Sequence, residues 1–142
     1  MKIAKLMVIA SLLGSVALVP ACKKETGSVE AEPVKLTIEQ LDTLLKSNTP
    51  PSVFDANNEE TRKENGVIPG AKLLSSSSNY DVSSTLPGDR ASKLVFYCGG
   101  VKCKAAEGAA KKALIAGYSD VNVLPDGIKG WKTAGKSTSV VN

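Results

Sequence analysis

The 142-residue sequence contains no histidine, and aromatic residues make up only 4% of it. Without histidine the chain has no Ser-His-Asp or Cys-His catalytic set, and most zinc chemistry is excluded. The remaining thiols and carboxylates show no metal-ligand spacing, so we expect neither a metal nor a cofactor. The sequence has three cysteines, at positions 22, 98 and 103.

The sequence also lacks a strong charge imbalance. It has 18 basic and 14 acidic residues, and two of the basic ones, Lys2 and Lys5, lie in the first five positions. There is no basic block and little aromatic interleaving, which argues against a nucleic-acid partner. Hydrophobic residues make up 42% of the sequence, enough for a core, and the length allows one domain.

The first 21 residues have the pattern of an export signal. A positive start, Met1–Lys5, precedes the apolar run Leu6–Val19, which is short for a transmembrane helix. The run ends in Leu18-Val19-Pro20-Ala21-Cys22, which resembles a bacterial lipoprotein cleavage site. The resemblance implies removal of a lipoprotein signal peptide, residues 1–21, and acylation of the Cys22 thiol. Ordinary secretory cleavage that leaves Cys22 free is the alternative.

Residues 22–35 are expected to be the lipidated cysteine and a flexible tether. The segment 23–33 is charged, small and bounded by proline, with no apolar period. Lipid chains on Cys22 hold a protein on a bilayer, so we expect a lipid-anchored protein of the cell envelope that faces the periplasm. Lys23 after the cysteine favours the outer membrane. Residues 36–142 then form the domain, which we expect to be a monomer.

Strand and helix patterns alternate along this domain. Thr37 and Gln40 form a capping-box pattern at the start of a helix. An alanine-rich helix is predicted over 104–116 and a short one over 128–131, with strands over 52–55, 71–74, 93–97 and 121–124. This alternation predicts an α/β fold with a mostly parallel central sheet and helices on both faces.

Cys98 lies where the strand 93–97 ends, shortly before the helix 104–116. Free N–H groups and the positive end of the helix dipole favour a thiolate there, so we expect the pKa of Cys98 to lie below the ordinary value of about 8.5. Gly99 and Gly100 are expected to supply positive φ for a loop that turns its N–H groups inward. Lys102 and Lys104 add positive charge. The alternative is a buried cysteine that forms a structural disulfide with Cys103.

Four motifs in order resemble the rhodanese homology domain. They are Val53-Phe54-Asp55, the turn Gly66-Val67-Ile68-Pro69-Gly70-Ala71, Cys98 with its loop, and an ending that comprises Ala116-Gly117-Tyr118, Val121-Asn122-Val123-Leu124, Asp126-Gly127-Ile128 and Gly130-Trp131. The resemblance covers residues 36–132. It implies a single rhodanese-like α/β domain and a thiosulfate sulfurtransferase-like enzyme.

The resemblance also implies roles for particular residues. Cys98 would take a sulfane sulfur from a small anion such as thiosulfate, become a persulfide, and pass the sulfur to a thiophilic acceptor such as a thiol. Asp55 corresponds to the family's acid and is interpreted as structural. The backbone cradle around the substrate would comprise Gly99, Gly100, Val101, Lys102 and Cys103.

The sequence departs from the family pattern at two places. Cys103 stands where many members carry a basic residue, and Asp55-Ala56-Asn57 stands in place of the usual D-x-R. In an oxidising compartment Cys103 is a possible resolving thiol, able to attack an oxidised or persulfidated Cys98 and form a reversible disulfide. Two alternatives to sulfur transfer therefore stay open: an inactive rhodanese-fold binding module, and a thiol–disulfide redox protein that uses Cys98 and Cys103.

Overall fold

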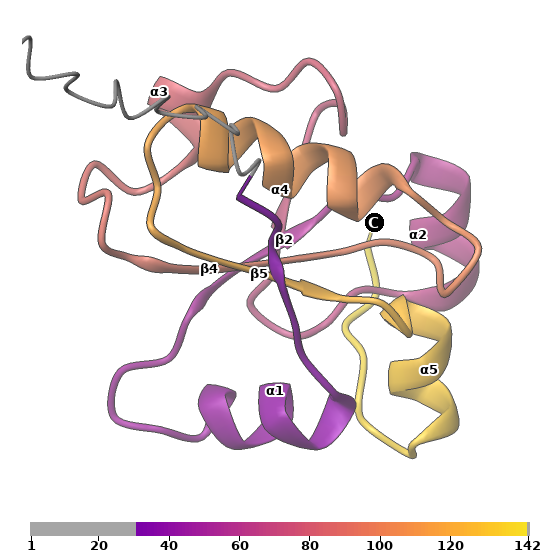
Figure 1. Cartoon of the computed structure of the whole chain (residues 1–142). Coiled ribbons are helices and arrows are strands. Elements are labelled where there is room, and N and C mark those ends of the chain that lie inside the picture. Colours follow the sequence, from indigo (N-terminus) through magenta and orange to yellow (C-terminus); the bar gives the residue numbers. More distant parts are fainter. Residues whose placement is uncertain (1–30, 142) are drawn as a thin grey trace, which may run out of the picture.

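Five short strands form one parallel sheet in the computed structural model, which describes residues 31–141. Their order across the sheet is β1-β5-β4-β2-β3, and each neighbouring pair is parallel. The strands are β1 (Val34–Lys35), β2 (Ser52–Asp55), β3 (Lys72–Leu73), β4 (Lys93–Tyr97) and β5 (Asp120–Leu124). The predicted parallel α/β sheet is therefore confirmed (Figure 1).

The helices are α1 (Ile38–Leu45), α2 (Glu59–Asn65), α3 (Val82–Thr85), α4 (Ala105–Ile115) and α5 (Gly127–Thr133). The predicted capping box at the start of α1 is present, because the Gln40 amide donates to Thr37 Oγ1 and the Thr37 amide donates to Gln40 Oε1. Asn58 caps α2 by accepting from the Thr61 amide. Such caps satisfy amides that the helix itself leaves without partners.

The helices cover both faces of the sheet, with α3 and α4 on one side and α1 and α5 on the other (Figure 1). Successive residues of β4 alternate between the faces, so Phe96 packs under α4 and Tyr97 packs toward α1 and α5. Alanines supply the buried face of α4 and let the helix lie close to the sheet; they are Ala106, Ala109, Ala110 and Ala113. Each apolar layer thus fixes one side of β4, the strand that leads to Cys98.

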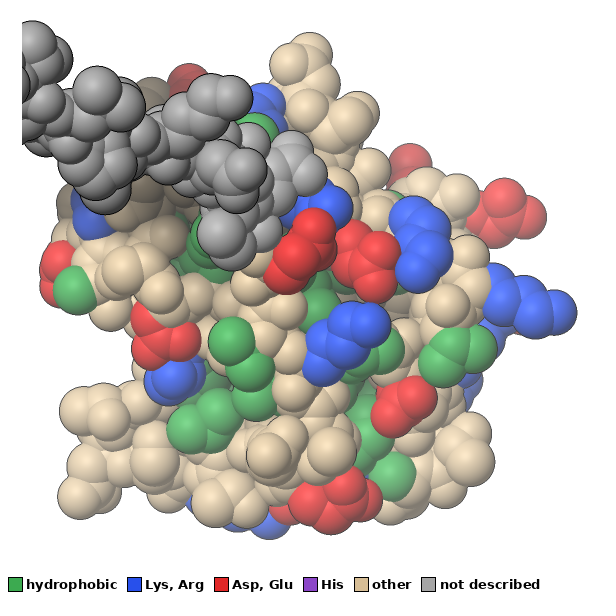
Figure 2. All heavy atoms as spheres, viewed as in Figure 1, with side chains coloured by type: hydrophobic (Ala, Val, Ile, Leu, Met, Phe, Trp, Pro, Cys, Tyr) green, Lys and Arg blue, Asp and Glu red, His purple; other side chains and the backbone are tan. Residues whose placement is uncertain are grey.

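The sheet begins at Val34, two residues before the predicted start of the domain, because β1 pairs with β5 at one edge. The predicted signal peptide and Cys22 lie outside the described residues. Within residues 31–141, the helices are all too short or too polar to cross a bilayer. On the face seen in Figure 2, basic and acidic side chains are interspersed among apolar ones.

Candidate active site

The parallel register brings three strand ends together at one edge of the sheet. Asp55 at the end of β2 pairs with Tyr97 at the end of β4, and Tyr97 pairs with Leu124 at the end of β5. The loops that follow these strands therefore start side by side. In parallel α/β sheets, this carboxyl edge is where ligands bind.

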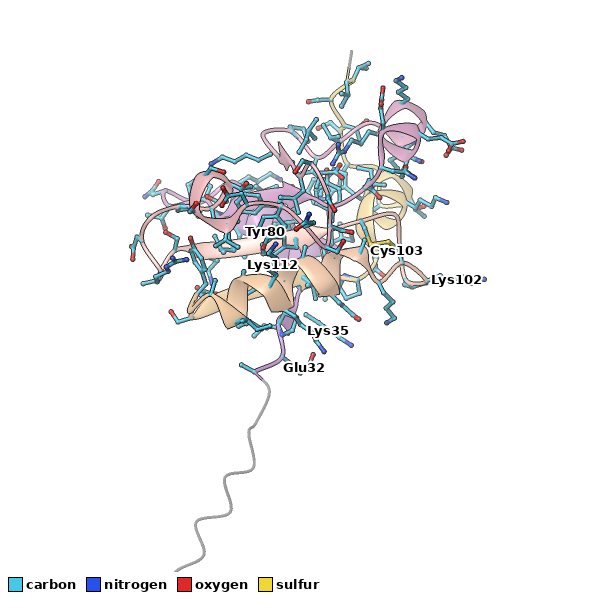
Figure 3. All side chains as sticks on the ribbon, turned by 90° about the horizontal axis from the view of Figure 1, so that it is seen from above. Glu32, Lys35, Tyr80, Lys102, Cys103 and Lys112 are labelled. Carbon is cyan, nitrogen blue, oxygen red and sulfur yellow. A yellow bond between two sulfur atoms is a disulfide. The ribbon has the colours of Figure 1, made fainter. Side chains whose placement is uncertain are left out.

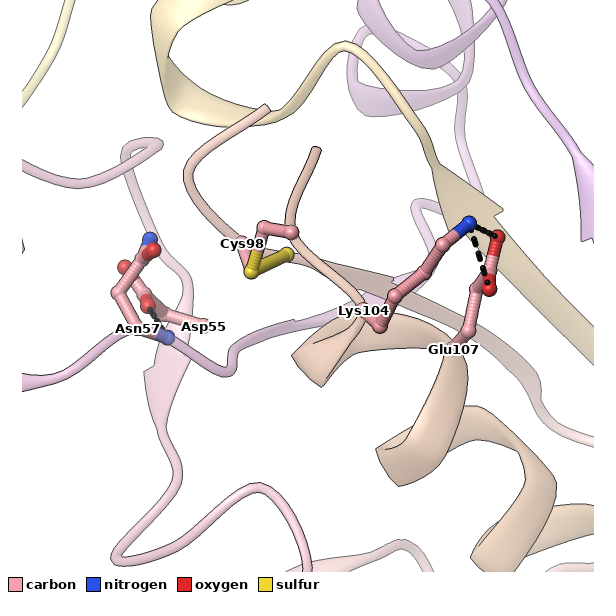
Figure 4. The surroundings of a disulfide bond; sticks show 6 residues. Asp55, Asn57, Cys98, Lys104 and Glu107 are labelled. Atoms are coloured by element: carbon pink, nitrogen blue, oxygen red, sulfur yellow. Dashed lines mark hydrogen bonds and ion pairs between the residues drawn. A yellow bond between two sulfur atoms is a disulfide. The ribbon is translucent and has the colours of Figure 1, made fainter. Parts of the chain in front are cut away.

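The loop after β4 begins at Cys98 and ends at Cys103, and the two cysteines form a disulfide (Figure 4). Their Cα atoms are 6.4 Å apart, within the ordinary range for a disulfide. The side chains differ in exposure, because Cys98 is 2% exposed in the apolar layer under α4 whereas Cys103 is only partly buried. The sequence left open a structural disulfide and a redox-active pair formed by Cys98 and Cys103, and the geometry that both require is present.

Two backbone hydrogen bonds from α5 hold the first half of the loop. The Ile128 amide donates to the Cys98 carbonyl at 2.8 Å, and the Lys129 amide donates to the Gly99 carbonyl at 3.1 Å. The loop then closes on itself, because the Cys103 amide donates to the Gly100 carbonyl at 2.8 Å. Within the described part of the chain, the amides of residues 99–102 donate to no protein acceptor. A run of free amides of this kind suits an anion.

The glycine that the loop requires is Gly127, and the expectation for Gly99 and Gly100 was wrong. Neither Gly99 nor Gly100 has a positive φ, whereas Gly127 has φ +57°. A Cβ at Gly127 would press on the Cys98 carbonyl oxygen and lie 2.7 Å from Gly100 N. The close approach is needed because the backbone of α5 reaches the loop carbonyls directly, so the steric constraint falls on the supporting helix and not on the loop.

A surface cavity of about 430 Å³ lies between this loop and α5. Lys102 from the loop and Lys129 from α5 line it, with Asp126 as the one acidic residue among the lining residues. Neither lysine forms an ion pair within residues 31–141, whereas Lys104 pairs with Glu107 (Figure 4). Lys102 projects away from the body of the domain beside Cys103 (Figure 3). The unpaired positive charge around the cavity is therefore carried by Lys102 and Lys129, and Asp126 opposes it as a carboxylate that also forms no ion pair within residues 31–141. The sequence analysis missed Lys129.

Asp55 is completely buried and accepts two short hydrogen bonds. The Asn57 amide donates to its Oδ1 and the Tyr97 hydroxyl donates to its Oδ2, each at 2.6 Å. The same hydroxyl accepts from the Ile68 amide at 3.0 Å. Burial, followed by the negative charge of Asp55, raises the pKa of Tyr97 far above its ordinary value, so the phenol remains a donor. Asp55 thus ties the ends of β2 and β4 to the turn at Ile68, which is a structural arrangement.

A model of the rhodanese-like domain matches residues 37–134, well over half of the sequence. The chain belongs to the rhodanese-like domain family. No curated protein matches it significantly. Solved structures that resemble this rhodanese-like domain include the BH2092 protein of Bacillus halodurans, with a TM-score of 0.65 and 23% identity over 75% of this chain and 77% of that one.

Two further similar structures are sulfurtransferases by name. The thiosulfate sulfurtransferase of Pseudomonas aeruginosa has a TM-score of 0.64 and 20% identity, over 78% of this chain and 21% of that one. The polysulfide-sulfur transferase homodimer of Wolinella succinogenes has a TM-score of 0.62 and 18% identity, over 81% and 84% of the two chains. At these identities the likeness establishes the rhodanese-like fold.

A guanidinium does reach the end of β2 in this rhodanese-like domain, although the D-x-R pattern is missing. Arg62 of α2 donates from Nη2 to the carbonyls of Asp55 (3.0 Å) and Leu74 (2.9 Å), and its Nε lies 3.4 Å from Asp55 Oδ1. The arginine therefore joins β2 to the segment after β3 and faces the buried carboxylate. No local pattern marks it, because it lies on a polar helix seven positions after Asp55.

Asn57 was given no role by the sequence analysis, yet it borders the loop. It is 9% exposed, and its Oδ1 lies near Gly99, where a Cβ would be 3.7 Å away (Figure 4). Its Nδ2 is buried without a partner in the described part of the chain. Within residues 31–141, no group of three cysteine or acidic side chains is placed to hold a metal ion.

Proposed function

We propose that this rhodanese-like domain is a sulfurtransferase or persulfide carrier in which Cys98 takes a sulfane sulfur from an anionic donor such as thiosulfate. One observation supports this above the others. Cys98 opens a loop whose next four amides have no protein acceptor within residues 31–141, beside a cavity lined by two unpaired cations, Lys102 and Lys129, and one carboxylate, Asp126. Free amides and unpaired cations favour both a thiolate and an incoming anion.

The loading step transfers one sulfur atom and requires reduced Cys98. The thiolate attacks the outer, sulfane sulfur of thiosulfate, the S–S bond of the donor breaks, and sulfite leaves with the electron pair. The enzyme is left as the Cys98 persulfide. A thiol acceptor then attacks the outer sulfur, and Cys98 leaves again as a thiolate. The Cys98–Cys103 disulfide has no free thiolate, so the oxidised protein is the inactive form of this cycle.

Sulfite release is the measurement that tests the proposal. The sheet and both apolar layers lie within residues 34–141, so a chain of residues 23–142 is used, reduced and freed of reductant without air. Thiosulfate should then release about one sulfite per chain. Cys98→Ser should release none, whereas Ile115→Ser, an exposed change at the far end of α4, should match the parent. Absence of sulfite from the reduced parent would overturn the proposal.

The two unpaired lysines give a second test, on the anionic nature of the donor. Replacing Lys102 and Lys129 together by methionine should slow loading by about threefold to tenfold at low salt, since exposed charges contribute little each. The difference in loading rate between the parent and the double variant should shrink as salt is added, because salt screens the attraction between the lysines and the anionic donor. Lys132→Met, on α5 but outside the cavity lining, is the matched control. An equal loss in the control, or a deficit independent of salt, would contradict an electrostatic role.

A second function is favoured by the disulfide itself. A thiol–disulfide redox protein would exchange the Cys98–Cys103 bond with partner thiols and handle no sulfane sulfur. Such a protein would react with dithiothreitol but release no sulfite from thiosulfate. Sulfite release therefore separates the two functions in one assay.

We also propose that the domain works on a membrane surface, tethered through acylated Cys22 on the periplasmic side, with the outer membrane as the site. The basis is the sequence pattern that ends at Cys22. Cell fractionation tests it: the full chain should partition with membranes, and Cys22→Ser should move to the soluble periplasmic fraction. Recovery of the parent chain in the soluble fraction would reject the tether.

A further inference from the structure

The disulfide places a second nucleophile at the other end of the catalytic loop. Cys103 lines the cavity, whereas Cys98 lies buried behind the loop. The turn that carries Cys103 is held by a hydrogen bond from the Cys103 amide to the Gly100 carbonyl, and the Cys103 Cα lies 6.4 Å from that of Cys98. The two side chains therefore meet with no change in the backbone. Any group carried on the Cys98 sulfur is held within reach of the Cys103 sulfur.

We propose that Cys103 resolves the Cys98 persulfide, so that the domain releases the transferred sulfur as sulfide and is left as the disulfide. This inference rests on the proposed sulfur loading. It adds a second reaction, the reduction of sulfane sulfur to sulfide. It also identifies the partner class that turnover needs, a dithiol reductant.

The step balances with the groups present. The Cys103 thiolate attacks Sγ of Cys98, the bond from that Sγ to the outer sulfur breaks, and the outer sulfur leaves as HS⁻ with the electron pair. The sulfane sulfur gains two electrons, and the two cysteines lose two as their disulfide forms. The proton of Cys103 passes to the leaving sulfur or to solvent. An external thiol acceptor competes by attacking the outer sulfur instead.

The partial exposure of the disulfide indicates how it is reduced again. Cys103 is the sulfur reached from the cavity, since Cys98 is 2% exposed and Cys103 is a lining residue. A dithiol therefore attacks Cys103 and releases Cys98 as the leaving thiolate. The second thiol of the reductant then frees Cys103, and both cysteines are ready for another donor. The Cys103 sulfur is therefore the atom that the reductant attacks first.

The experiment compares the parent chain, Cys103→Ser and the control Ile115→Ser, all reduced, freed of reductant and given thiosulfate without air. Sulfite, sulfide and intact mass are measured on the same samples. The parent and the control should release sulfite and about one sulfide per chain, and lose two hydrogens in mass. Cys103→Ser should release sulfite, release less than about a tenth as much sulfide, and keep the extra sulfur. Dithiothreitol should then restore a second round in the parent.

The outcomes separate this inference from the function on which it rests. If parent and Cys103→Ser both release sulfite and both keep the extra sulfur, the resolving role of Cys103 is overturned and sulfur loading stands. If neither releases sulfite, no persulfide forms, and both proposals are overturned. Sulfide released equally from Cys103→Ser would assign the reduction to another group and would also overturn the inference.

Discussion

Replacing Gly127 by alanine should damage the loop more than the same change at Gly135, although both glycines have a positive φ. The angles are +57° at Gly127 and +73° at Gly135, so the left-handed backbone costs each alanine about 1–2 kcal/mol. A Cβ at Gly135 meets nothing within 4 Å, whereas one at Gly127 lies 2.7 Å from Gly100 N and presses on the Cys98 carbonyl. These obstacles are backbone atoms, which cannot rotate away.

The expected difference follows from the backbone clash. Forcing atoms into a packed region costs about 1–3 kcal/mol, so Gly127→Ala should lower the free energy of unfolding by about 2–5 kcal/mol and Gly135→Ala by about 1–2. Urea denaturation of the reduced 23–142 chain measures both. Sulfite release from thiosulfate should fall in Gly127→Ala and hold in Gly135→Ala, because only the first moves the loop. Equal stability losses, or unchanged sulfite release in Gly127→Ala, would refute the reasoning.

Two further predictions concern the sheet ends and the edge of α1. Tyr97→Phe removes a donor from the buried Asp55 carboxylate and should lower the free energy of unfolding, measured by urea denaturation, by about 2–4 kcal/mol. Tyr80→Phe loses a hydrogen bond to the neutral Ala109 carbonyl and should lower it by about 1 kcal/mol. Equal losses would argue against a charged acceptor for Tyr97. Hydrogen bonds from Lys136, and next from Lys46, lower the pKa of Asp42 below its ordinary value of 3.8. The ionised Asp42 therefore stabilises the folded state fully above pH 3.8, and this contribution is lost as the pH falls through the pKa of the folded protein. The stability gap between parent and Asp42→Asn, followed by thermal denaturation, should therefore close in acid; a gap independent of pH would contradict the pairing.

The sequence predicted those elements whose causes are local. The Thr37–Gln40 capping box fixed the start of α1, and the β-branched and aromatic run of 93–97 fixed β4, because cap and strand signals depend on adjacent residues. The two-residue strand β1 and the four-residue helix α3 were missed. Neither segment has an apolar pattern of its own: β1 is defined by its pairing with β5 at the sheet edge, and α3 buries none of its residues.

The site shows the same division. Cys98 and its loop follow from the strand-to-helix junction, which sequence can locate. Lys129, Gly127 and Arg62 depend on how α5 and α2 pack against strands far away in sequence, so composition and spacing do not reveal them. The Gly127 constraint had one available signal in the sequence, its place in the motif Asp126-Gly127-Ile128, but Gly99 and Gly100 lie nearer to Cys98 in the sequence and were expected to meet the steric need instead.

The support of the Cys98 loop by α5 has a consequence for the order in which the chain matures. Translation delivers Cys98 and Gly99 well before Ile128 and Lys129, whose amides hold the carbonyls of those two residues. A nascent chain that lacks α5 has both thiols but lacks the two hydrogen bonds that hold the loop between them. If Cys98 carries sulfur as proposed, that chemistry would begin only when the last helix has docked, and a truncation before that helix would leave both thiols without the supported loop.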